Sequence, residues 1–348
     1  MRTEVYKILD PMGKDKSALE IAAEKIKSGG LVVFPTETVY GLGADATDEK
    51  AVSSIFEAKG RPSDNPLIIH VADPMDADKY AFTSRLYYAL AERFMPGPLT
   101  VIMKSREIIP KRTRGGLDTV AVRCPEALIA RELIRLSKTP IAAPSANLSG
   151  SPSPTSAKHV IDDMMGRVDV ILDGGDADFG LESTIVKIED DDTLTLLRPG
   201  KITAEELSLV APVSIAEAVT DMLREGEKAI SPGMKYRHYA PKAPLLLIEA
   251  DADKLISYIK EQGKRNIAII AYDESINEIK KAIPYAYTYS FGKTDDEVLQ
   301  AHNLFAILRD ADERNFDEIY APLPKKTGIS LALYNRMIRA AAHKIIRM

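Results

Sequence analysis

The sequence has only one cysteine, Cys124, among its 348 residues. A single cysteine excludes an intramolecular disulfide and any cysteine-rich zinc cluster, and it fits a reducing compartment. Long hydrophobic runs are missing as well: residues 1–15 hold no apolar stretch of signal-peptide length, and no window approaches a membrane span. We therefore expect a cytoplasmic protein with no membrane partner.

An excess of positive charge is also absent. Forty-six Lys and Arg stand against 51 Asp and Glu, which gives a formal net charge of -5. This balance argues against a protein that wraps long nucleic acid by charge alone, although a local basic cleft remains possible. With 45% hydrophobic residues and no internal repeat, a chain of this length is expected to form two domains.

The first two hundred residues alternate between helix-like and strand-like segments. Residues 17–29 have a helical apolar period that ends at Gly29-Gly30, and residues 31–34 form a buried apolar run. Further helices are expected at 48–58 and 84–95, and further strands at 66–72, 99–104, 119–124, 140–143, 168–174 and 183–188. Several of these strands are β-branched without polar alternation, which indicates a covered sheet. We predict a mixed α/β domain with an extensive, twisted sheet.

A second α/β unit is predicted after residue 244. Strand-like runs at 245–250, 266–272, 285–290 and 317–322 alternate with helical patterns at 252–262, 296–313 and 329–346. In the long helix one face holds Val298, Ala301, Leu304, Phe305 and Leu308; in the last helix it holds Leu331, Tyr334, Met337, Ile338, Ala341 and Ile345. The alternation predicts a small Rossmann-like domain. The unit lacks a G-x-G-x-x-G fingerprint, so nucleotide binding there is not supported.

Two short motifs in the first domain predict a phosphate pocket. Lys59 and Arg61 stand one residue apart on a segment expected to be extended, and the turn 144–147 reads PSAN. Arginine offers a planar fork of donors to phosphate, whereas the lysine ammonium acts as a mobile point charge. The alternative is a solvated, proline-rich loop with ordinary surface charges, which a K-x-R pattern by itself does not exclude.

Other polar residues stand near the ends of the predicted strands, where α/β sites collect. Thr36 lies in the polar segment 34–46, which predicts either a ligand-binding loop or a tight turn. Arg123 ends an apolar strand and needs either a carboxylate ligand or a salt bridge to a protein carboxylate. His70 is either a ligand contact or a structural histidine. Cys124 is expected to be a small core residue rather than a nucleophile.

Taken together, these segments resemble the long, two-domain form of threonylcarbamoyl-adenylate synthase, whose catalytic part is a YrdC-like domain. The resemblance rests on KGRP, PSAN, FPTETVYGLG, STIV, LRPG and SPGMKYRHYAP, and it covers nearly the whole chain. It implies a YrdC-like domain at 1–210, a linker at 211–244 and a Rossmann-like domain at 245–348. The family forms threonylcarbamoyl-AMP and pyrophosphate from L-threonine, bicarbonate and ATP with Mg²⁺, and the product passes to a tRNA threonylcarbamoyltransferase complex.

The resemblance also implies roles for individual residues. Catalytic positions are Lys59, Arg61, Ser145 and Asn147. ATP contacts are Lys59, Ser63, Thr119, Ser145, Ser153, Arg198 and Tyr236. L-threonine contacts are Thr36, His70, Arg123, Ala143 through its backbone, and Ser183. No metal-ligating side chain is implied, since Mg²⁺ comes with ATP.

The linker is predicted to act as a lid, because residues 229–244 combine three prolines with Tyr236, Arg237, His238 and Tyr239. Two other functions compete with the synthase. A related carbamoyl-adenylate enzyme of hydrogenase maturation has cysteine-rich zinc motifs, which one cysteine cannot provide. An RNA-binding, translation-associated module would need a basic surface, and the acidic balance together with the absence of an aromatic-rich basic stripe weakens it, so stable nucleic-acid binding is not expected.

Overall fold

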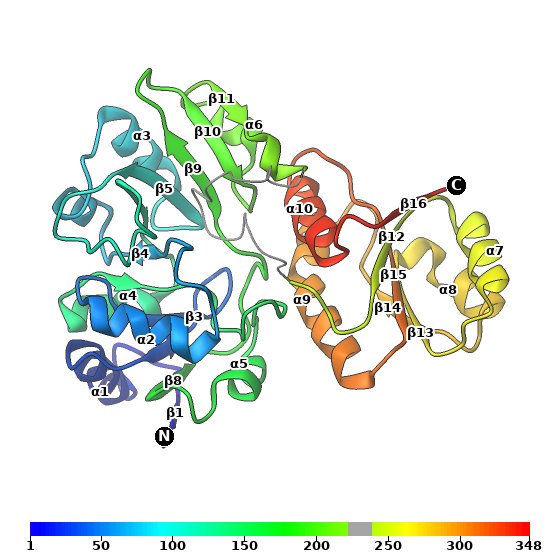
Figure 1. Cartoon of the computed structure of the whole chain (residues 1–348), viewed down its shortest axis with the longest axis horizontal. Helices are drawn as coiled ribbons and strands as arrows, with labels where there is room; N and C mark the ends of the chain where they lie inside the picture. Colours follow the sequence, from blue (N-terminus) through cyan, green and yellow to red (C-terminus); the bar gives the residue numbers. More distant parts are fainter. Residues whose placement is uncertain (222–238) are drawn as a thin grey trace. The chain divides into compact units, whose positions relative to one another are not determined.

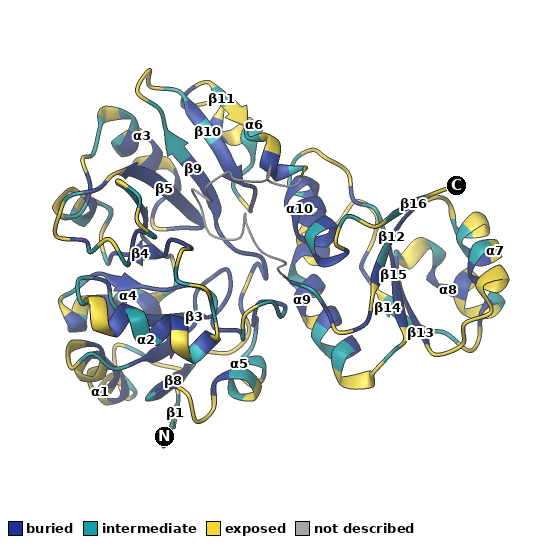
Figure 2. Ribbon diagram, in the orientation of Figure 1, coloured by how far each residue is buried: buried dark blue, intermediate teal, exposed yellow. Residues whose placement is uncertain are grey.

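A computed structural model describes residues 1–221 and 239–348. The chain divides into two compact units. The first contains Met1–Ser149 and the described part of Ser153–Tyr236; the second contains Gly150–Pro152 and the described part of Arg237–Met348. Each unit has its own sheet and its own buried core (Figures 1 and 2).

The first unit is built around an eleven-stranded mixed sheet in the order β1-β8-β2-β3-β7-β4-β6-β5-β9-β10-β11. The strands are β1 (Glu4–Lys7), β2 (Val32–Phe34), β3 (Gly41–Asp45), β4 (Ile68–His70), β5 (Leu99–Lys104), β6 (Thr119–Arg123), β7 (Ile141–Ala142), β8 (Val170–Asp173), β9 (Thr184–Ile188), β10 (Leu194–Arg198) and β11 (Val213–Ile215). The predicted extensive mixed sheet is therefore confirmed. β11 pairs in parallel with β10, so the sheet continues beyond residue 210.

Helices cover this sheet: α1 (Lys16–Lys27), α2 (Glu49–Lys59), α3 (Arg85–Phe94), α4 (Leu128–Ser137), α5 (Ala157–Met164) and α6 (Ala204–Leu207), with 3-10 turns η1 (Pro74–Lys79) and η2 (Glu217–Val219). The apolar faces of α1 and α4 share a core with strands β2 and β8, where Leu19, Ile26 and Leu133 meet Phe34 and Leu172. Because these strands are apolar except at Asp173, the sequence pattern alone identified them as covered.

The end of α2 corrects one prediction about the phosphate motif. Lys59 and Arg61 do not share an extended segment: Lys59 is the last residue of α2, and Gly60 ends the helix in the left-handed region with φ of 61°. Asp48 caps the other end of α2 by accepting hydrogen bonds from the backbone of Lys50 and Ala51. Glycine takes the left-handed conformation without a steric penalty, so the chain turns sharply between the two cations.

The second unit has a fully parallel five-stranded sheet in the order β14-β13-β15-β12-β16. Its elements are β12 (Leu245–Glu249), α7 (Ala252–Gln262), β13 (Ile267–Ala271), α8 (Asp273–Ala282), β14 (Tyr287–Ser290), α9 (Glu297–Arg314), β15 (Glu318–Pro322), α10 (Ser330–Ala340) and β16 (Ile345–Arg347). The predicted Rossmann-like alternation is confirmed, and α8 is a helix that the sequence pattern missed.

Two details of the second unit differ from the sequence pattern. The final helix does not reach residue 346: α10 ends at Ala340, and Ile345 lies in β16, which pairs with β12. Ala342 and His343 take positive φ values of 47° and 60°, which break the helix before the strand. In α9, Val298 is 47% exposed, so it lies outside the buried face formed by Ala301, Leu304, Phe305 and Leu308.

Candidate active site

A row of polar side chains crosses the middle of the first sheet. His70 on β4 lies level with Arg123 on β6, and Thr100 on β5 lies level with Arg123 on its other side. The hydroxyls of Thr100 and Ser183 are 2.8 Å apart, which carries the row to the start of β9. All four side chains are buried. Buried polar groups in a sheet centre are expensive unless they are bonded, so this row indicates a functional site.

Arg123 is held by the segment that follows β2. Its Nη2 donates to Glu37 Oε1 at 2.5 Å and to the Thr38 hydroxyl at 2.9 Å. The sequence predicted either a ligand or a protein carboxylate as the partner of Arg123, and the structure shows that Glu37 is such a protein carboxylate. Arg123 Nε is buried and has no hydrogen-bond partner among the described residues. The guanidinium thus retains an unused donor that a ligand carboxylate can accept.

Glu37 connects this arginine to the next turn of the chain. Its Oε1 binds Arg123, and its Oε2 accepts hydrogen bonds from the backbone of Glu126 at 3.1 Å and Ala127 at 3.4 Å. Both side chains of the ion pair are 5% exposed. One buried carboxylate thus holds Arg123 and the chain that enters α4 in a single arrangement.

His70 is a neutral, fully enclosed histidine. Burial is the main cause that lowers its pKa to about 3, and the nearby positive charge of Arg123 lowers it further. Its Nδ1 lies 3.3 Å from the carbonyl oxygen of Ile141. A neutral ring in that position donates from Nδ1 to the carbonyl and keeps Nε2 as an acceptor. This hydrogen bond is the one expected of a structural histidine, and it leaves Nε2 available to a ligand.

The pKa of His70 predicts an acid-sensitive fold. Between pH 6.5 and about 3 the unfolded chain binds a proton at this histidine and the folded chain does not. Stability is therefore complete above pH 6.5 and falls as the pH drops through this range, by about 1.4 kcal/mol per pH unit from this group. Denaturant unfolding of the wild type and of His70→Gln at pH 7 and pH 5 should show a smaller loss in the variant. Equal losses would contradict the assignment.

Lys59 and the PSAN turn come together as the sequence predicted. Lys59 is only 3% exposed, and its Nζ donates to the carbonyl oxygens of Ser145 and Asn147, both at 2.5 Å. The Ser145 hydroxyl donates to Asn147 Oδ1 at 2.5 Å. An isolated β-bridge joins Ser145 to Gly41, so the turn also lies beside the start of β3. The turn thus holds a buried positive charge.

Arg198 and Ser183 form a second bonded pair at the ends of β10 and β9. Arg198 Nε donates to the Ser183 carbonyl oxygen at 2.9 Å, and Nη2 donates to the Ser183 hydroxyl at 3.0 Å. Since that hydroxyl also meets Thr100, Arg198 is linked through it to the polar row. Ser153 donates to Glu182 Oε1 at 2.5 Å, and both residues are buried.

The other predicted site residues that the structure describes in the first unit differ in which hydrogen-bonding groups remain for a ligand. The Thr36 hydroxyl donates to the Val39 carbonyl oxygen at 2.6 Å and accepts from two backbone N–H groups, so its bonds are local. The backbone N–H of Ala143 donates to Ile68, which leaves its carbonyl for a ligand. Arg61, Ser63 and Thr119 are half-buried. Tyr236 and the predicted lid residues Arg237 and His238 lie outside the described residues.

Sequence reasoning missed two members of the site. Thr100 was read only as part of an apolar strand, and Glu182 was not singled out although it precedes Ser183. A polar residue inside an otherwise apolar run was the available signal for Thr100.

Cys124 is buried, and burial raises the pKa of its thiol to about 12, in agreement with a core role. Within residues 1–221 and 239–348, no three His, Cys, Asp or Glu side chains are placed to hold a metal ion together.

Comparison with known proteins agrees with this geometry. Residues 24–200 match the family described as Telomere recombination, and residues 202–342 match the family described as Threonylcarbamoyl-AMP synthase, C-terminal domain. The threonylcarbamoyl-AMP synthase of Pyrococcus abyssi is 44% identical over 95% of this chain and 96% of its own length. The chain belongs to the threonylcarbamoyl-AMP synthase family. It is therefore an enzyme of this type, with the YrdC-like and Rossmann-like parts expected from its sequence.

Further relatives cover both units of this synthase. The Bacillus subtilis threonylcarbamoyl-AMP synthase is 42% identical over 98% of the chain and 97% of its own length. The crystal structure of Pyrococcus abyssi Sua5 complexed with L-threonine has a TM-score of 0.88 at 42% identity and covers all of both chains. None of the helices in the described ranges is both long and apolar enough to cross a bilayer.

Proposed function

We propose that this synthase joins L-threonine, bicarbonate and ATP into threonylcarbamoyl-AMP and pyrophosphate at the polar row and the Lys59 turn. The threonine amine and bicarbonate form a carbamate with loss of water. A carbamate oxygen then attacks the α-phosphorus of ATP, and the bond to pyrophosphate breaks. No protein nucleophile is needed, so positioning and charge stabilisation carry the catalysis.

The observation that carries this proposal is the attachment of Lys59 to the PSAN turn. The buried ammonium donates to the carbonyl oxygens of Ser145 and Asn147 and so lies directly against the turn. A cation held at this turn can stabilise an anion that binds there. We assign Lys59, Arg61, Ser145 and Asn147 to the reacting phosphates, with Arg198 and Ser153 nearby. Mg²⁺ would arrive bound to the ATP phosphates, whose charge it neutralises.

The threonine subsite is assigned to the polar row itself. Arg123 Nε would donate to the threonine carboxylate, and the neutral His70 ring would accept a hydrogen bond from a substrate N–H or O–H group. Thr36, Ser183 and the carbonyl of Ala143 would complete this subsite. The complex of Pyrococcus abyssi Sua5 with L-threonine supports threonine as the amino acid.

Replacement of Arg123 by alanine separates the two subsites. The threonine carboxylate would lose a charge-assisted contact of about 1.5 to 3 kcal/mol, so the threonine KM should rise far more than the ATP KM. Initial rates measured against each substrate would check this. An equal rise of both constants would show that Arg123 is structural or contacts the nucleotide.

The overall reaction is tested by mass spectrometry of the products formed from ATP, bicarbonate and L-threonine. Threonylcarbamoyl-AMP and pyrophosphate in equal amounts are expected, and omission of threonine should abolish both. Formation of pyrophosphate without threonine would reject the proposed reaction.

The remaining assignments rest on the sequence. We propose a YrdC-like catalytic domain at 1–210, a linker at 211–244 that closes over the site, and a Rossmann-like domain at 245–348. The linker positions 222–238 lie outside the described residues. We also propose that the enzyme works in the cytoplasm and passes its product to a tRNA threonylcarbamoyltransferase complex. Buried Cys124 with its protonated thiol suits a reducing compartment.

A further inference from the structure

A cavity of about 220 Å³ opens in the second unit at the carboxyl ends of its parallel strands. Ile248 from β12, Ala271 from β13 and Pro322 from β15 line it, together with Thr294 from the loop after β14. Three neighbouring strands of one sheet and the loop after a fourth therefore contribute to the same cavity. In open α/β sheets this edge is where ligands bind.

The strand order explains why space remains there. Helices α7 and α8, which follow β12 and β13, share a core with one face of the sheet. β15 lies between β12 and β13 but is followed by α10, which with α9 covers the opposite face (Figure 1). After β15 the chain therefore crosses one face of the sheet, whereas after its two neighbours, β12 and β13, it crosses the other face. Such a divergence keeps the loops apart and leaves a crevice above the sheet.

The walls of the cavity are apolar and carry no positive charge. Ile248, Leu255, Ile279 and Pro322 supply aliphatic surface, and no lysine or arginine is among the lining residues. The ionisable groups at the cavity are two carboxylates, Asp251 and Glu274, and the phenol of Tyr272. A phosphate would meet like charges without a cationic partner, so the lining disfavours nucleotides and other anions.

The polar groups differ in whether they are already bonded. Both oxygens of Glu274 accept hydrogen bonds from Thr294. Asp251 Oδ1 caps α7 by accepting from the backbone of Lys254 at 2.9 Å. Within residues 1–221 and 239–348, Asp251 Oδ2 and the Tyr272 hydroxyl have no hydrogen-bond partner. These two atoms are therefore available to a ligand.

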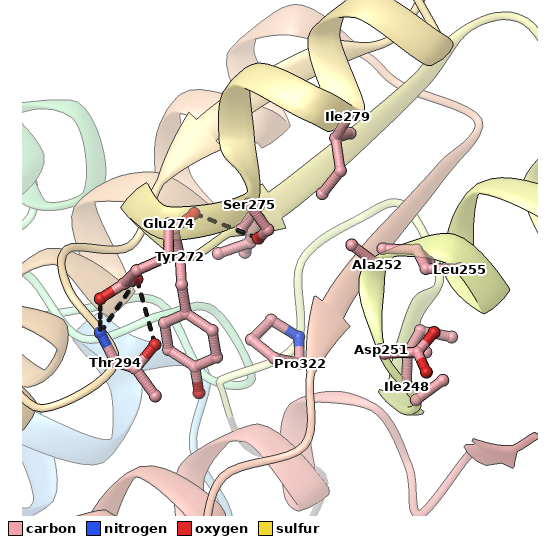
Figure 3. A pocket seen from close by; sticks show the side chains of 13 residues that line it. Ile248, Asp251, Ala252, Leu255, Tyr272, Glu274, Ser275, Ile279, Thr294 and Pro322 are labelled. Atoms are coloured by element: carbon pink, nitrogen blue, oxygen red, sulfur yellow. Dashed lines mark hydrogen bonds between the residues drawn. The ribbon is translucent and has the colours of Figure 1, made fainter.

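Figure 3 shows Tyr272 and Asp251 on either side of Pro322, with Ile279 and Leu255 along the wall. An available acceptor and an available hydroxyl thus flank an apolar floor. Burial raises the pKa of Tyr272, which keeps its hydroxyl protonated and able to donate. The cavity is smaller than the roughly 300 to 1,000 Å³ of pockets that hold drug-sized ligands, so its occupant is a compact molecule.

We propose that this cavity binds a purine nucleoside without phosphate. The flat base would lie on the aliphatic wall, a ribose hydroxyl would donate to Asp251 Oδ2, and the Tyr272 hydroxyl would bond a ring nitrogen. A carboxylate at a strand end that accepts from ribose is a recurrent arrangement in α/β proteins. The absence of a G-x-G-x-x-G fingerprint agrees with a site that receives no phosphate. This site does not depend on the proposed catalytic roles.

The test is calorimetric titration of the full-length protein with adenosine while a non-hydrolysable ATP analogue saturates the catalytic site. We expect one adenosine per chain under these conditions, and AMP should bind at least about tenfold more weakly because its phosphate meets the carboxylates. No adenosine binding at millimolar concentration would overturn the proposal. Equal binding of AMP would overturn it as well.

Two conservative variants locate the site. Asp251→Asn keeps a helix cap, because asparagine caps as well as aspartate, but it replaces the available acceptor. Tyr272→Phe removes only the hydroxyl. Tyr272→Phe should weaken adenosine about fivefold to tenfold, the effect of one neutral hydrogen bond, and Asp251→Asn should weaken it more than about tenfold because the lost bond is charge-assisted. Asp253→Asn is the matched control, since this carboxylate is in the same helical turn but does not line the cavity. Unchanged affinity in both site variants would reject the assignment.

Discussion

Replacement of Lys59 by alanine is expected to lower the rate of threonylcarbamoyl-AMP formation by at least about 100-fold. The ammonium is the buried charge attached to the PSAN turn, so its loss removes stabilisation where negative charge shifts during pyrophosphate release. Turnover should fall at saturating ATP as well as at low ATP. Rapid-quench measurement of adenylate formation would record the effect.

The same substitution should also destabilise the fold, because Lys59 is buried rather than exposed. The carbonyl oxygens of Ser145 and Asn147 would lose their donor, at about 1 to 3 kcal/mol in the free energy of unfolding. Activity must therefore be compared at a temperature where the variant remains folded, with threonine binding as a check of the other subsite. Lys50→Ala, on the exposed side of the same helix, is the matched control. Wild-type turnover in folded Lys59→Ala would remove Lys59 from the catalytic machinery.

Replacement of Glu37 by glutamine should raise the threonine KM more than tenfold and leave the ATP KM within about twofold. Glu37 holds Nη2 of Arg123 at 2.5 Å, and it also fixes the backbone at Glu126. Without its charge the guanidinium is no longer fixed with Nε directed to the substrate. Because one charge of a buried pair is left uncompensated, the free energy of unfolding should fall by about 3 to 5 kcal/mol. Steady-state kinetics and denaturant unfolding would measure both effects.

A double variant separates the effect on threonine binding from the effect on the stability of the fold. Glu37→Leu combined with Arg123→Met removes both buried charges, so it should recover part of the stability lost in Glu37→Gln while threonine binding stays weak. Glu20→Gln is a control, because Glu20 forms a solvent-exposed pair with Lys16 and such pairs contribute about 0 to 1 kcal/mol. Recovery of threonine affinity in the double variant would mean that Glu37 and Arg123 have only a structural role.

Much of the architecture was readable from local sequence. Apolar β-branched runs predicted the central strands because covered strands need no polar alternation, and the period of 17–29 predicted a helix close to α1. The ends of helices and strands were predicted less well where a helical and a strand pattern overlapped. Residues 329–346 keep a helical apolar period, yet the chain leaves the helix at Ala340 because Ile345 pairs with β12. Ile345 and its partner Leu247 are far apart in the sequence, so no local apolar pattern predicts their pairing.

By itself, the sequence determined which side chains are available for chemistry: the K-x-R and PSAN motifs, a single arginine at the end of β6, and a lone cysteine without a thiol partner. Only the tertiary structure decided what each of them contacts. Parallel pairing of β4 with β6 places His70 beside Arg123, and the turn after β2 brings Glu37 to the same arginine across 86 positions of sequence. The end of α2 buries Lys59 against a turn of the chain 86 to 88 positions away. Burial and charge partners depend on such remote contacts, so the neutral state of His70 and the fixed position of Arg123 follow from the fold rather than from any motif.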